Sequence, residues 1–276
     1  MPWVKRKTMK IQTEGIRRIV VKVGTSTLTH ANGTMNLRKI EKLVRCLADI
    51  KNTGKQVILV SSGAVGCGLA KLQFDRETLT TRQKQAAAAV GQCDLIGMYS
   101  REFAQYGHTV AQILLTKEII DDEARYEKAK NTVETLLEAG VLPIVNENDT
   151  VSDEQIRFGS NDTLAAIVAL LSGADLLVNL SDVNGLYTSD PRKDPNAKLL
   201  DCVSAITPEI EASAGGAGSA RGTGGMVAKL QSARMVTEAG IPMIICNGDD
   251  PAMLYSILDG LFIGTYFEAK QEGKTV

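Results

Sequence analysis

Short apolar runs alternate with helical patterns along this chain, and the alternation limits its fold more than any other feature of the sequence. Each run is rich in Val, Ile or Leu, as is typical of a strand buried on both faces of a parallel sheet. The runs predict strands at residues 19–24, 56–63, 109–116, 141–145, 175–180 and 241–246. Apolar residues at helical spacing predict helices at residues 37–50, 80–105, 125–139, 163–173 and 226–239.

This order of elements predicts an α/β fold, a three-layer α/β/α sandwich in which helices cover both faces of a mostly parallel central sheet. The chain has 276 residues and is 44% hydrophobic, which is sufficient for one large core. We expect a flexible N-terminal extension at residues 1–18, one domain at 19–268 and a tail at 269–276. Ligands of open α/β sheets bind beyond the carboxyl ends of the strands, so the functional residues are expected there.

Charge and cysteine content argue against several classes of function. The formal net charge is −1 and the isoelectric point is about 6.2, so no broad basic surface is expected for a nucleic acid. The five cysteines include no CxxC pair, which argues against a zinc site or a disulfide framework, and no metal-ligating residues are predicted. No apolar run reaches the roughly 18 residues of a membrane span. We therefore expect a cytoplasmic protein without a nucleic acid or membrane partner.

Loops of small, acidic and amide residues lie between the predicted strands and helices. They are GTST at 24–27, SSGAVG at 61–66, NENDT at 146–150, GSNDT at 159–163 and LSDVNG at 180–185. A glycine lets backbone N–H groups approach a phosphate closely, although a single glycine more often marks a tight turn. The amide and acidic residues could likewise be ordinary turn formers. Together, however, these loops are expected to line one cleft.

Two lysines and one Asn–Asp pair each allow a structural and a functional interpretation. Lys22 lies inside an apolar strand, where an ammonium group either reaches solvent from an edge strand or meets a negative partner. Lys229 follows the glycine turn TGGM, and lies either on a solvated helix face or beside a bound phosphate. Asn161 and Asp162 could simply cap the helix that follows them.

Six motifs in this order resemble the amino acid kinase family, and most closely its glutamate-phosphorylating branch. They are VKVGTSTLT (21–29), SSGAVGCG (61–68), NENDTVS (146–152), FGSNDTLAA (158–166), LSDVNGLYTSDPR (180–192) and GTGGMVAKL (222–230). The acetylglutamate kinase and uridylate kinase branches remain as alternatives, together with a non-catalytic nucleotide or amino acid sensor on the same fold. A dinucleotide-dependent oxidoreductase is not supported, because GTST lacks the G-x-G-x-x-G pattern.

The resemblance implies that the γ-phosphoryl group of ATP moves to the side-chain carboxylate of L-glutamate, giving L-glutamyl 5-phosphate for proline biosynthesis. Mg²⁺ would bridge the ATP phosphates and take few protein ligands. The implied catalytic residues are Lys22 and Lys229, which stabilise the transferring group, and Asp162, which holds both ammonium groups. A glutamate carboxylate has a pKa of about 4.3 and is already ionised at neutral pH, so no general base is needed.

The resemblance also assigns binding residues, position by position. Those implied for the glutamate substrate are Ser62, Gly63, Ala64, Asp149 and Asn161. Those implied for ATP are Lys22, Gly24, Thr25, Ser181, Asp182, Thr223, Gly224, Gly225, Met226, Val227, Ala228 and Lys229.

The same resemblance implies several partners. We expect a homo-oligomer, either a dimer or a tetramer, with proline as a feedback inhibitor and with hand-off of the product to glutamyl phosphate reductase. Many members carry a further C-terminal RNA-binding-like domain, and the sequence ending at Val276 is expected to be a short form without it.

Overall fold

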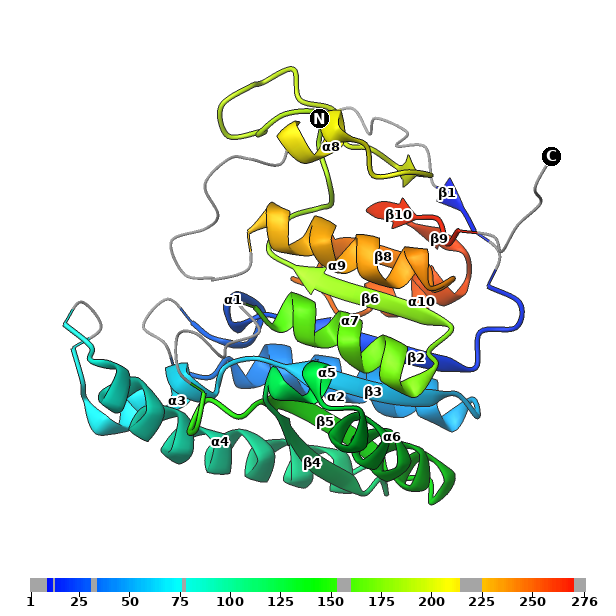
Figure 1. Cartoon of the computed structure of the whole chain (residues 1–276). Helices are drawn as coiled ribbons and strands as arrows, with labels where there is room; N and C mark the ends of the chain where they lie inside the picture. The colour runs from blue at the N-terminus through cyan, green and yellow to red at the C-terminus, as the bar shows by residue number, and fades with distance from the viewer. Residues whose placement is uncertain are drawn as a thin grey trace.

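The computed structural model describes residues 9–11, 13–30, 34–75, 78–152, 160–213 and 225–270. In this part of the chain, helices cover both faces of an eight-stranded sheet (Figure 1). Across the sheet, the strands follow the order β4 (Val110–Leu115), β5 (Leu142–Glu147), β3 (Gln56–Ser61), β2 (Arg18–Val23), β6 (Leu176–Ser181), β8 (Met243–Asn247), β10 (Thr265–Phe267) and β7 (Cys202–Val203). Neighbours from β4 to β8 are parallel, whereas β10 is antiparallel to β8. The predicted three-layer α/β/α architecture is confirmed.

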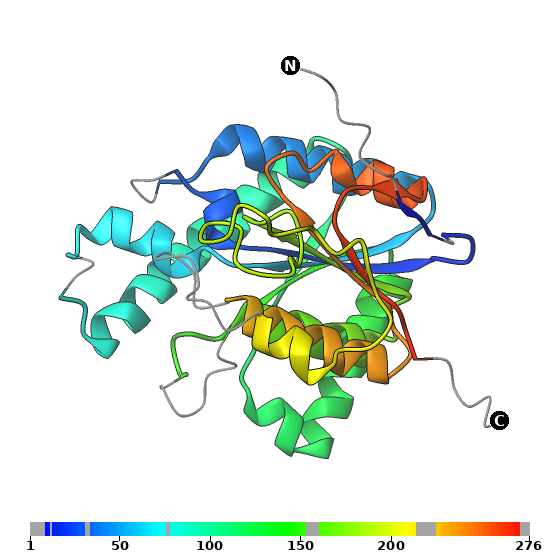
Figure 2. The same ribbon diagram turned by 90° about the horizontal axis from the view of Figure 1, so that it is seen from above.

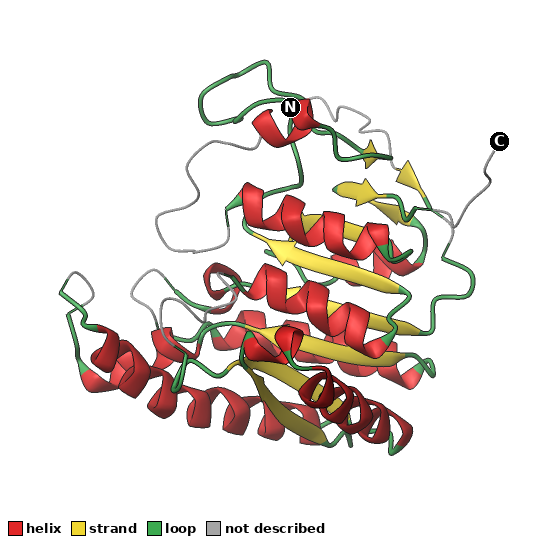
Figure 3. Cartoon of the chain, viewed as in Figure 1, coloured by secondary structure: helices red, strands yellow, loops and turns green. Residues whose placement is uncertain are grey.

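The two faces of the sheet carry different helices, as Figure 2 shows from above. On one face, α2 (Leu37–Asn52), α4 (Thr81–Ala104) and α10 (Met253–Leu258) contribute to one apolar core. On the other face, α6 (Glu123–Glu138), α7 (Asn161–Ser172) and α9 (Met226–Glu238) contribute to a second core. Shorter helices are α1 (Thr25–Leu28), α3 (Ala64–Leu72), α5 (Glu118–Asp121) and α8 (Pro208–Ser213). Figure 3 shows the same arrangement coloured by secondary structure.

The strand β2 lies inside the sheet, between β3 and β6. Side chains alternate between the two faces of a strand, so Val21 packs into the core under α2 and α10, and Val20 into the core under α7. Lys22 follows the same alternation and therefore faces α7. In register, it stands opposite Val60 of β3 and Asn179 of β6. The edge-strand interpretation of Lys22 is therefore wrong.

The structure corrects three details at the ends of the predicted strands. The helix α3 begins at Ala64, where the sequence predicts only the loop SSGAVG. The strand β5 continues to Glu147, so Asn146 and Glu147, the first two residues of the motif NENDT, belong to the sheet. The helix α7 begins at Asn161 and has Ser160 as its N-cap, so Asn161 and Asp162 lie in the first turn of the helix and do not precede it.

Glycines bring α3 and α4 into close contact, which explains why a glycine-rich segment is helical. A Cβ added to Gly68 would lie 1.8 Å from the carbonyl oxygen of Ala87. A Cβ added to Gly91 would lie 1.8 Å from the carbonyl oxygen of Ala64. Both distances are far below van der Waals contact, so only glycine permits this packing. The first residue of α3 is thereby pressed against α4.

Short strands near the two ends of the described chain were not predicted. Residues Met9–Lys10 form β1, which pairs antiparallel with β9 (Leu261–Phe262) in a separate two-stranded sheet. Ile11 is buried and joins the core under α2 and α10. The strands β7, β9 and β10 have only two or three residues each, too few to show a period in the sequence.

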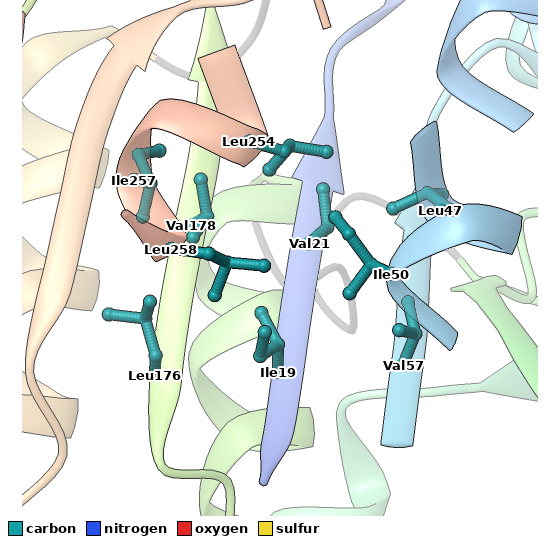
Figure 4. A pocket seen from close by; sticks show the side chains of 10 residues that line it. All are labelled: Ile19, Val21, Leu47, Ile50, Val57, Leu176, Val178, Leu254, Ile257 and Leu258. Atoms are coloured by element: carbon teal, nitrogen blue, oxygen red, sulfur yellow. The ribbon is translucent and has the colours of Figure 1, made fainter. Parts of the chain in front are cut away.

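An apolar cavity of about 10 Å³ lies in the core beneath α2 and α10 (Figure 4). It is lined by aliphatic side chains such as Val21, Leu47 and Leu254. Its size is that of one water molecule at most and it offers no polar partner, so it is not a ligand site. Among the described residues, no helix combines the length and the apolar character that crossing a membrane requires.

Candidate active site

Two lysines and one aspartate meet where β2 ends and α7 and α9 begin. Nζ of Lys22, on β2, lies 2.6 Å from Oδ1 of Asp162, in the first turn of α7. Nζ of Lys229, in the first turn of α9, donates to Oδ2 of the same carboxylate at 3.1 Å. Asn179, on β6, donates its Nδ2 to Oδ1 of Asp162 at 2.7 Å. The structure thus brings together the three residues for which the resemblance implies catalysis.

All three charged side chains are buried, with exposed fractions of 6% for Lys22, 1% for Asp162 and 5% for Lys229. The solvated-face interpretation of Lys229 is therefore wrong. Burial lowers the pKa of Lys22 below its ordinary value of 10.5, although the Asp162 carboxylate opposes part of this change. Burial would raise the pKa of Asp162, but the ammonium groups of Lys22 and Lys229 outweigh it and hold that pKa below 3.8. The carboxylate is therefore ionised at neutral pH.

Two buried polar atoms next to this cluster have no hydrogen-bond partner within the described ranges. They are Oγ of Ser160, at the N-cap of α7, and Oδ1 of Asn179, whose amide nitrogen bonds Asp162. Buried polar atoms are nearly always hydrogen-bonded, so each unmet one requires an explanation. A polar ligand or an ordered water completes such positions.

Two glycine turns flank the cluster at the ends of β2 and β3. Gly24 is the N-cap of α1, and a Cβ added there would lie 3.6 Å from Nζ of Lys22. Gly63 is the N-cap of α3 and has φ of +114°, a backbone conformation that favours glycine. Thr25 is the first residue of α1 and is half-buried. The Gly24 turn therefore lies beside the buried ammonium of Lys22, and the phosphate cradle at Gly24 and Gly63 stays a prediction.

The residues implied for the substrate lie after the ends of β3 and β5 and at the start of α7. Nδ2 of Asn161 donates to Oγ of Ser62 at 2.7 Å and to Oδ1 of Asn146 at 3.0 Å. Gly63 and Ala64 are buried directly after Ser62. Asp149 is half-buried in the turn that follows β5. The amides of Asn146 and Asn179 were not singled out from the sequence, because an Asn near the end of a strand is also an ordinary residue of turns.

The residues implied for ATP lie around the start of α9 and the end of β6. Gly225 is the N-cap of α9, and Met226, Val227 and Ala228 form the first turn before Lys229. Val227 is 47% exposed although it is apolar. Ser181 ends β6 and is buried, and its Oγ donates to the exposed carboxylate of Asp182 at 3.2 Å. Thr223 and Gly224 lie outside the described residues.

This arrangement is suited to holding a polyanion. It combines two buried ammonium groups, a helix N-terminus and two glycine turns, all of which favour negative charge. No cluster of three His, Cys, Asp or Glu side chains that could hold a metal occurs in the described part of the chain.

Comparisons with known proteins agree on one family. The model of the amino acid kinase family matches residues 17–247. The glutamate 5-kinase of Clostridium perfringens (strain 13 / Type A) is 54% identical over 259 residues, which cover 92% of this chain and 96% of that protein. The glutamate 5-kinase of Listeria monocytogenes serovar 1/2a is 48% identical over 268 residues, which cover 96% of this chain and 97% of that protein.

Solved structures give the same fold at much lower sequence identity. An X-ray structure of isopentenyl phosphate kinase has a TM-score of 0.64 and 17% identity, and the match covers 91% of this chain and 100% of that one. At this identity the likeness concerns the fold alone.

Proposed function

The chain belongs to the amino acid kinase family, and we propose that it transfers the γ-phosphoryl group of ATP to the side-chain carboxylate of L-glutamate. In this reaction an oxygen of the carboxylate forms a bond to the γ-phosphorus. The bond from that phosphorus to the β–γ bridging oxygen breaks, and ADP leaves with the electron pair. The product is L-glutamyl 5-phosphate, an acyl phosphate that serves as the first intermediate of proline biosynthesis.

The buried Lys22–Asp162–Lys229 cluster is the observation that supports this proposal most strongly. The obstacle to the reaction is electrostatic, because a carboxylate must approach a polyphosphate. In a loose transition state, negative charge spreads over three equatorial oxygens of the transferring group, and fixed cations stabilise it. Lys22 and Lys229 supply such cations from opposite sides of one carboxylate. Asp162 holds both and reduces their mutual repulsion, and it takes no part in proton transfer.

Glutamate is recognised by the residues at the ends of β3 and β5 and at the start of α7. Asp149 is chemically suited to the α-ammonium group, because a carboxylate accepts charge-assisted hydrogen bonds. Ser62 and Asn161 contact each other and offer hydroxyl and amide groups to the rest of the amino acid. Gly63 and Ala64 contribute backbone next to Ser62 that a larger side chain would obstruct. N-Acetylglutamate has no α-ammonium group, so a site of this polarity favours free glutamate.

ATP is held by the glycine turns and by the N-terminus of α9. Gly24 and Thr25 approach the phosphates from the end of β2, and Gly225 and the first turn of α9 do so from the other side. Ser181 and Asp182 complete the nucleotide site at the end of β6. Mg²⁺, bound to the phosphate oxygens, would neutralise part of their charge.

The other proposals concern partners and organisation. We propose that residues 19–268 form the catalytic unit, that it assembles into a dimer or tetramer in the cytoplasm, and that proline inhibits it at the glutamate pocket. An acyl phosphate hydrolyses readily in water, which favours direct hand-off to glutamyl phosphate reductase. Sedimentation of the purified chain, proline titration of its activity, and co-sedimentation with that reductase test these proposals separately.

A panel of acceptors tests the proposed reaction. ADP release is measured with ATP, Mg²⁺ and either glutamate, N-acetylglutamate, aspartate or UMP. Glutamate is expected to give by far the highest kcat/KM. Turnover with UMP alone or N-acetylglutamate alone would contradict the proposed substrate.

The variant Lys229→Met tests the assigned role of the cluster. It removes one cation and keeps the length of the side chain, so kcat is expected to fall by at least about a hundredfold, in the range seen when one stabilising group is lost. A thermal melt close to that of the parent protein shows that the variant is folded. Near-normal phosphorylation of glutamate by a folded Lys229→Met protein would refute the role.

A further inference from the structure

A row of hydrogen-bonded side-chain amides connects the proposed glutamate site to Gln92, a buried residue of α4. Oε1 of Gln92, on α4, accepts from Nδ2 of Asn146 at 2.9 Å. Oδ1 of Asn146 accepts from Nδ2 of Asn161 at 3.0 Å, and the same Nδ2 donates to Oγ of Ser62 at 2.7 Å. Gln92 is only 8% exposed and Asn146 only 3%, so this part of the row is shielded from water.

A backbone group fixes the direction of every hydrogen bond in this row of side chains. The backbone N–H of Glu147 donates to the side chain of Asn146 at 2.9 Å, and a backbone nitrogen can only donate. The Asn146 atom that it meets must therefore be Oδ1, which leaves Nδ2 to face Gln92. The Gln92 atom in contact must then be the acceptor Oε1. By the same reasoning, Asn161 must present its Nδ2 to Asn146.

This direction determines what the site offers to a ligand. The two hydrogens of Asn161 Nδ2 are both used, by Asn146 and Ser62, so its remaining polar atom is the acceptor Oδ1. Ser62 accepts from Asn161, so its own O–H remains to donate. Within the described residues, neither Oδ1 of Asn161 nor the hydroxyl hydrogen of Ser62 has a partner. The pair offers one acceptor and one donor, which matches an ammonium and a carboxylate of an amino acid.

We propose that Gln92 is a positioning residue for glutamate recognition, acting through Asn146 on Asn161 and Ser62. The inference rests on the proposed function, since it assigns the pair to the amino acid substrate. Gln92 supplies the only contact on the buried Nδ2 of Asn146 among the described residues. Without an acceptor at position 92, the buried Nδ2 of Asn146 has no hydrogen-bond partner among the described residues, and the orientation of the Asn146 amide is no longer fixed from that side.

The helix α4, which carries Gln92, also packs against the residues on either side of Ser62. Tyr99 lies seven residues further along α4, and its hydroxyl shares a hydrogen bond of 2.9 Å with Oγ of Ser61, the residue before Ser62. Gly91, next to Gln92, contacts the carbonyl of Ala64 so closely that a Cβ there would lie 1.8 Å away. Thus α4 contacts Ser61 and Ala64, which flank Ser62, and contacts Asn146 through Gln92. Of these contacts, the one from Gln92 sets the orientation of the amides.

The test compares two substitutions of Gln92 in the full chain. Gln92→Met keeps the length and volume of the side chain but removes the acceptor, whereas Gln92→Glu keeps an acceptor oxygen. For Gln92→Met, we expect KM for glutamate to rise by about tenfold, equal to about 1.4 kcal/mol of binding free energy, with KM for ATP unchanged. For Gln92→Glu, we expect KM for glutamate at least about threefold below that of Gln92→Met, because the Asn146 donor is satisfied again.

A matched control separates positioning from general stability. Thr237→Val removes a buried hydroxyl that donates to Ala233 at 2.8 Å near the end of α9, away from the site, so it should lower the melting temperature and leave KM for glutamate unchanged. Unchanged KM for glutamate in a folded Gln92→Met protein would overturn the inference, and so would equal rises in KM for glutamate and ATP. If Gln92→Met does not fold, Gln92→Ala replaces it, and we again expect a raised KM for glutamate with an unchanged KM for ATP. A parent protein that does not phosphorylate glutamate would contradict the proposed function instead.

Discussion

Replacing Asp162 with Asn removes the negative charge that bridges two buried ammonium groups and leaves the shape of the side chain almost unchanged. The attraction across 2.6 Å and 3.1 Å corresponds to about 6 and about 5 kcal/mol at an effective dielectric constant of about 20. Much of this attraction only offsets the cost of burying the charges, which is several kcal/mol for each ion. Asp162→Asn loses the attraction but keeps the cost of burying Lys22 and Lys229. We therefore expect the free energy of unfolding to fall by about 3–5 kcal/mol, and turnover to fall because the lysines repel each other.

Denaturant unfolding at pH 7 measures this effect in full. In the folded chain the pKa of Asp162 is held below 3.8, so its contribution to stability is present above that pH and is lost only as the pH falls through the lowered value. The matched control is Asp249→Asn, which breaks an ion pair of 2.7 Å between Lys39 and a carboxylate that is 74% exposed. An exposed pair contributes at most about 1 kcal/mol. A loss for Asp162→Asn no larger than that of the control would refute this electrostatic reasoning.

Two further predictions concern pH and packing. Because burial lowers the pKa of Lys22, its ammonium group should be lost at a pH below 10.5, and kcat/KM for glutamate should fall there. The contribution of Lys22 to stability rises over the same pH range, because the unfolded chain binds more protons than the folded chain. A profile of kcat/KM that stays level up to pH 10.5 would be inconsistent with this role. Gly91→Ala places a Cβ 1.8 Å from the carbonyl oxygen of Ala64, so it should destabilise the protein by at least about 1–3 kcal/mol and raise KM for glutamate. Gly97→Ala in the same helix places a Cβ 3.6 Å from the end of the Arg101 side chain, which is ordinary van der Waals contact, so it should instead stabilise by about 0.5–1 kcal/mol. Equal melting temperatures for the two variants would contradict the packing argument.

The order of strands and helices was predictable because each element carries its own local pattern. Asn36, for example, is a residue type that favours the N-cap position, and its side chain accepts from the backbone of Lys39 at the start of α2. The helix α3 was not predicted, because its glycines look like a loop until the close approach of α4 is known. Glycine at Gly68 and Gly91 serves packing between two helices, which a local pattern does not contain.

The candidate site was predictable only where chemistry conflicts with local structure or where the motifs resemble a family. Lys22 was conspicuous because an ammonium inside an apolar strand needs an explanation. Lys229 was ambiguous, since nothing local shows that its helix face meets Asp162, which lies 67 positions earlier in the chain. Gln92 was missed because a polar residue in a helix usually faces solvent, and Asn146 was predicted only as part of the cleft loop NENDT, without a role of its own. Only the fold shows that these two amides are buried and meet.

Transfer of an isotopic label tests most directly whether a glutamate carboxylate attacks the γ-phosphorus. Glutamate labelled with oxygen-18 in its side-chain carboxylate is incubated with ATP, Mg²⁺, hydroxylamine and the enzyme. Hydroxylamine attacks the acyl carbon of the product, so we expect glutamyl hydroxamate together with an equal amount of phosphate that carries one labelled oxygen from the carboxylate. Release of ADP with unlabelled phosphate and no hydroxamate would show attack by water, and would contradict the account.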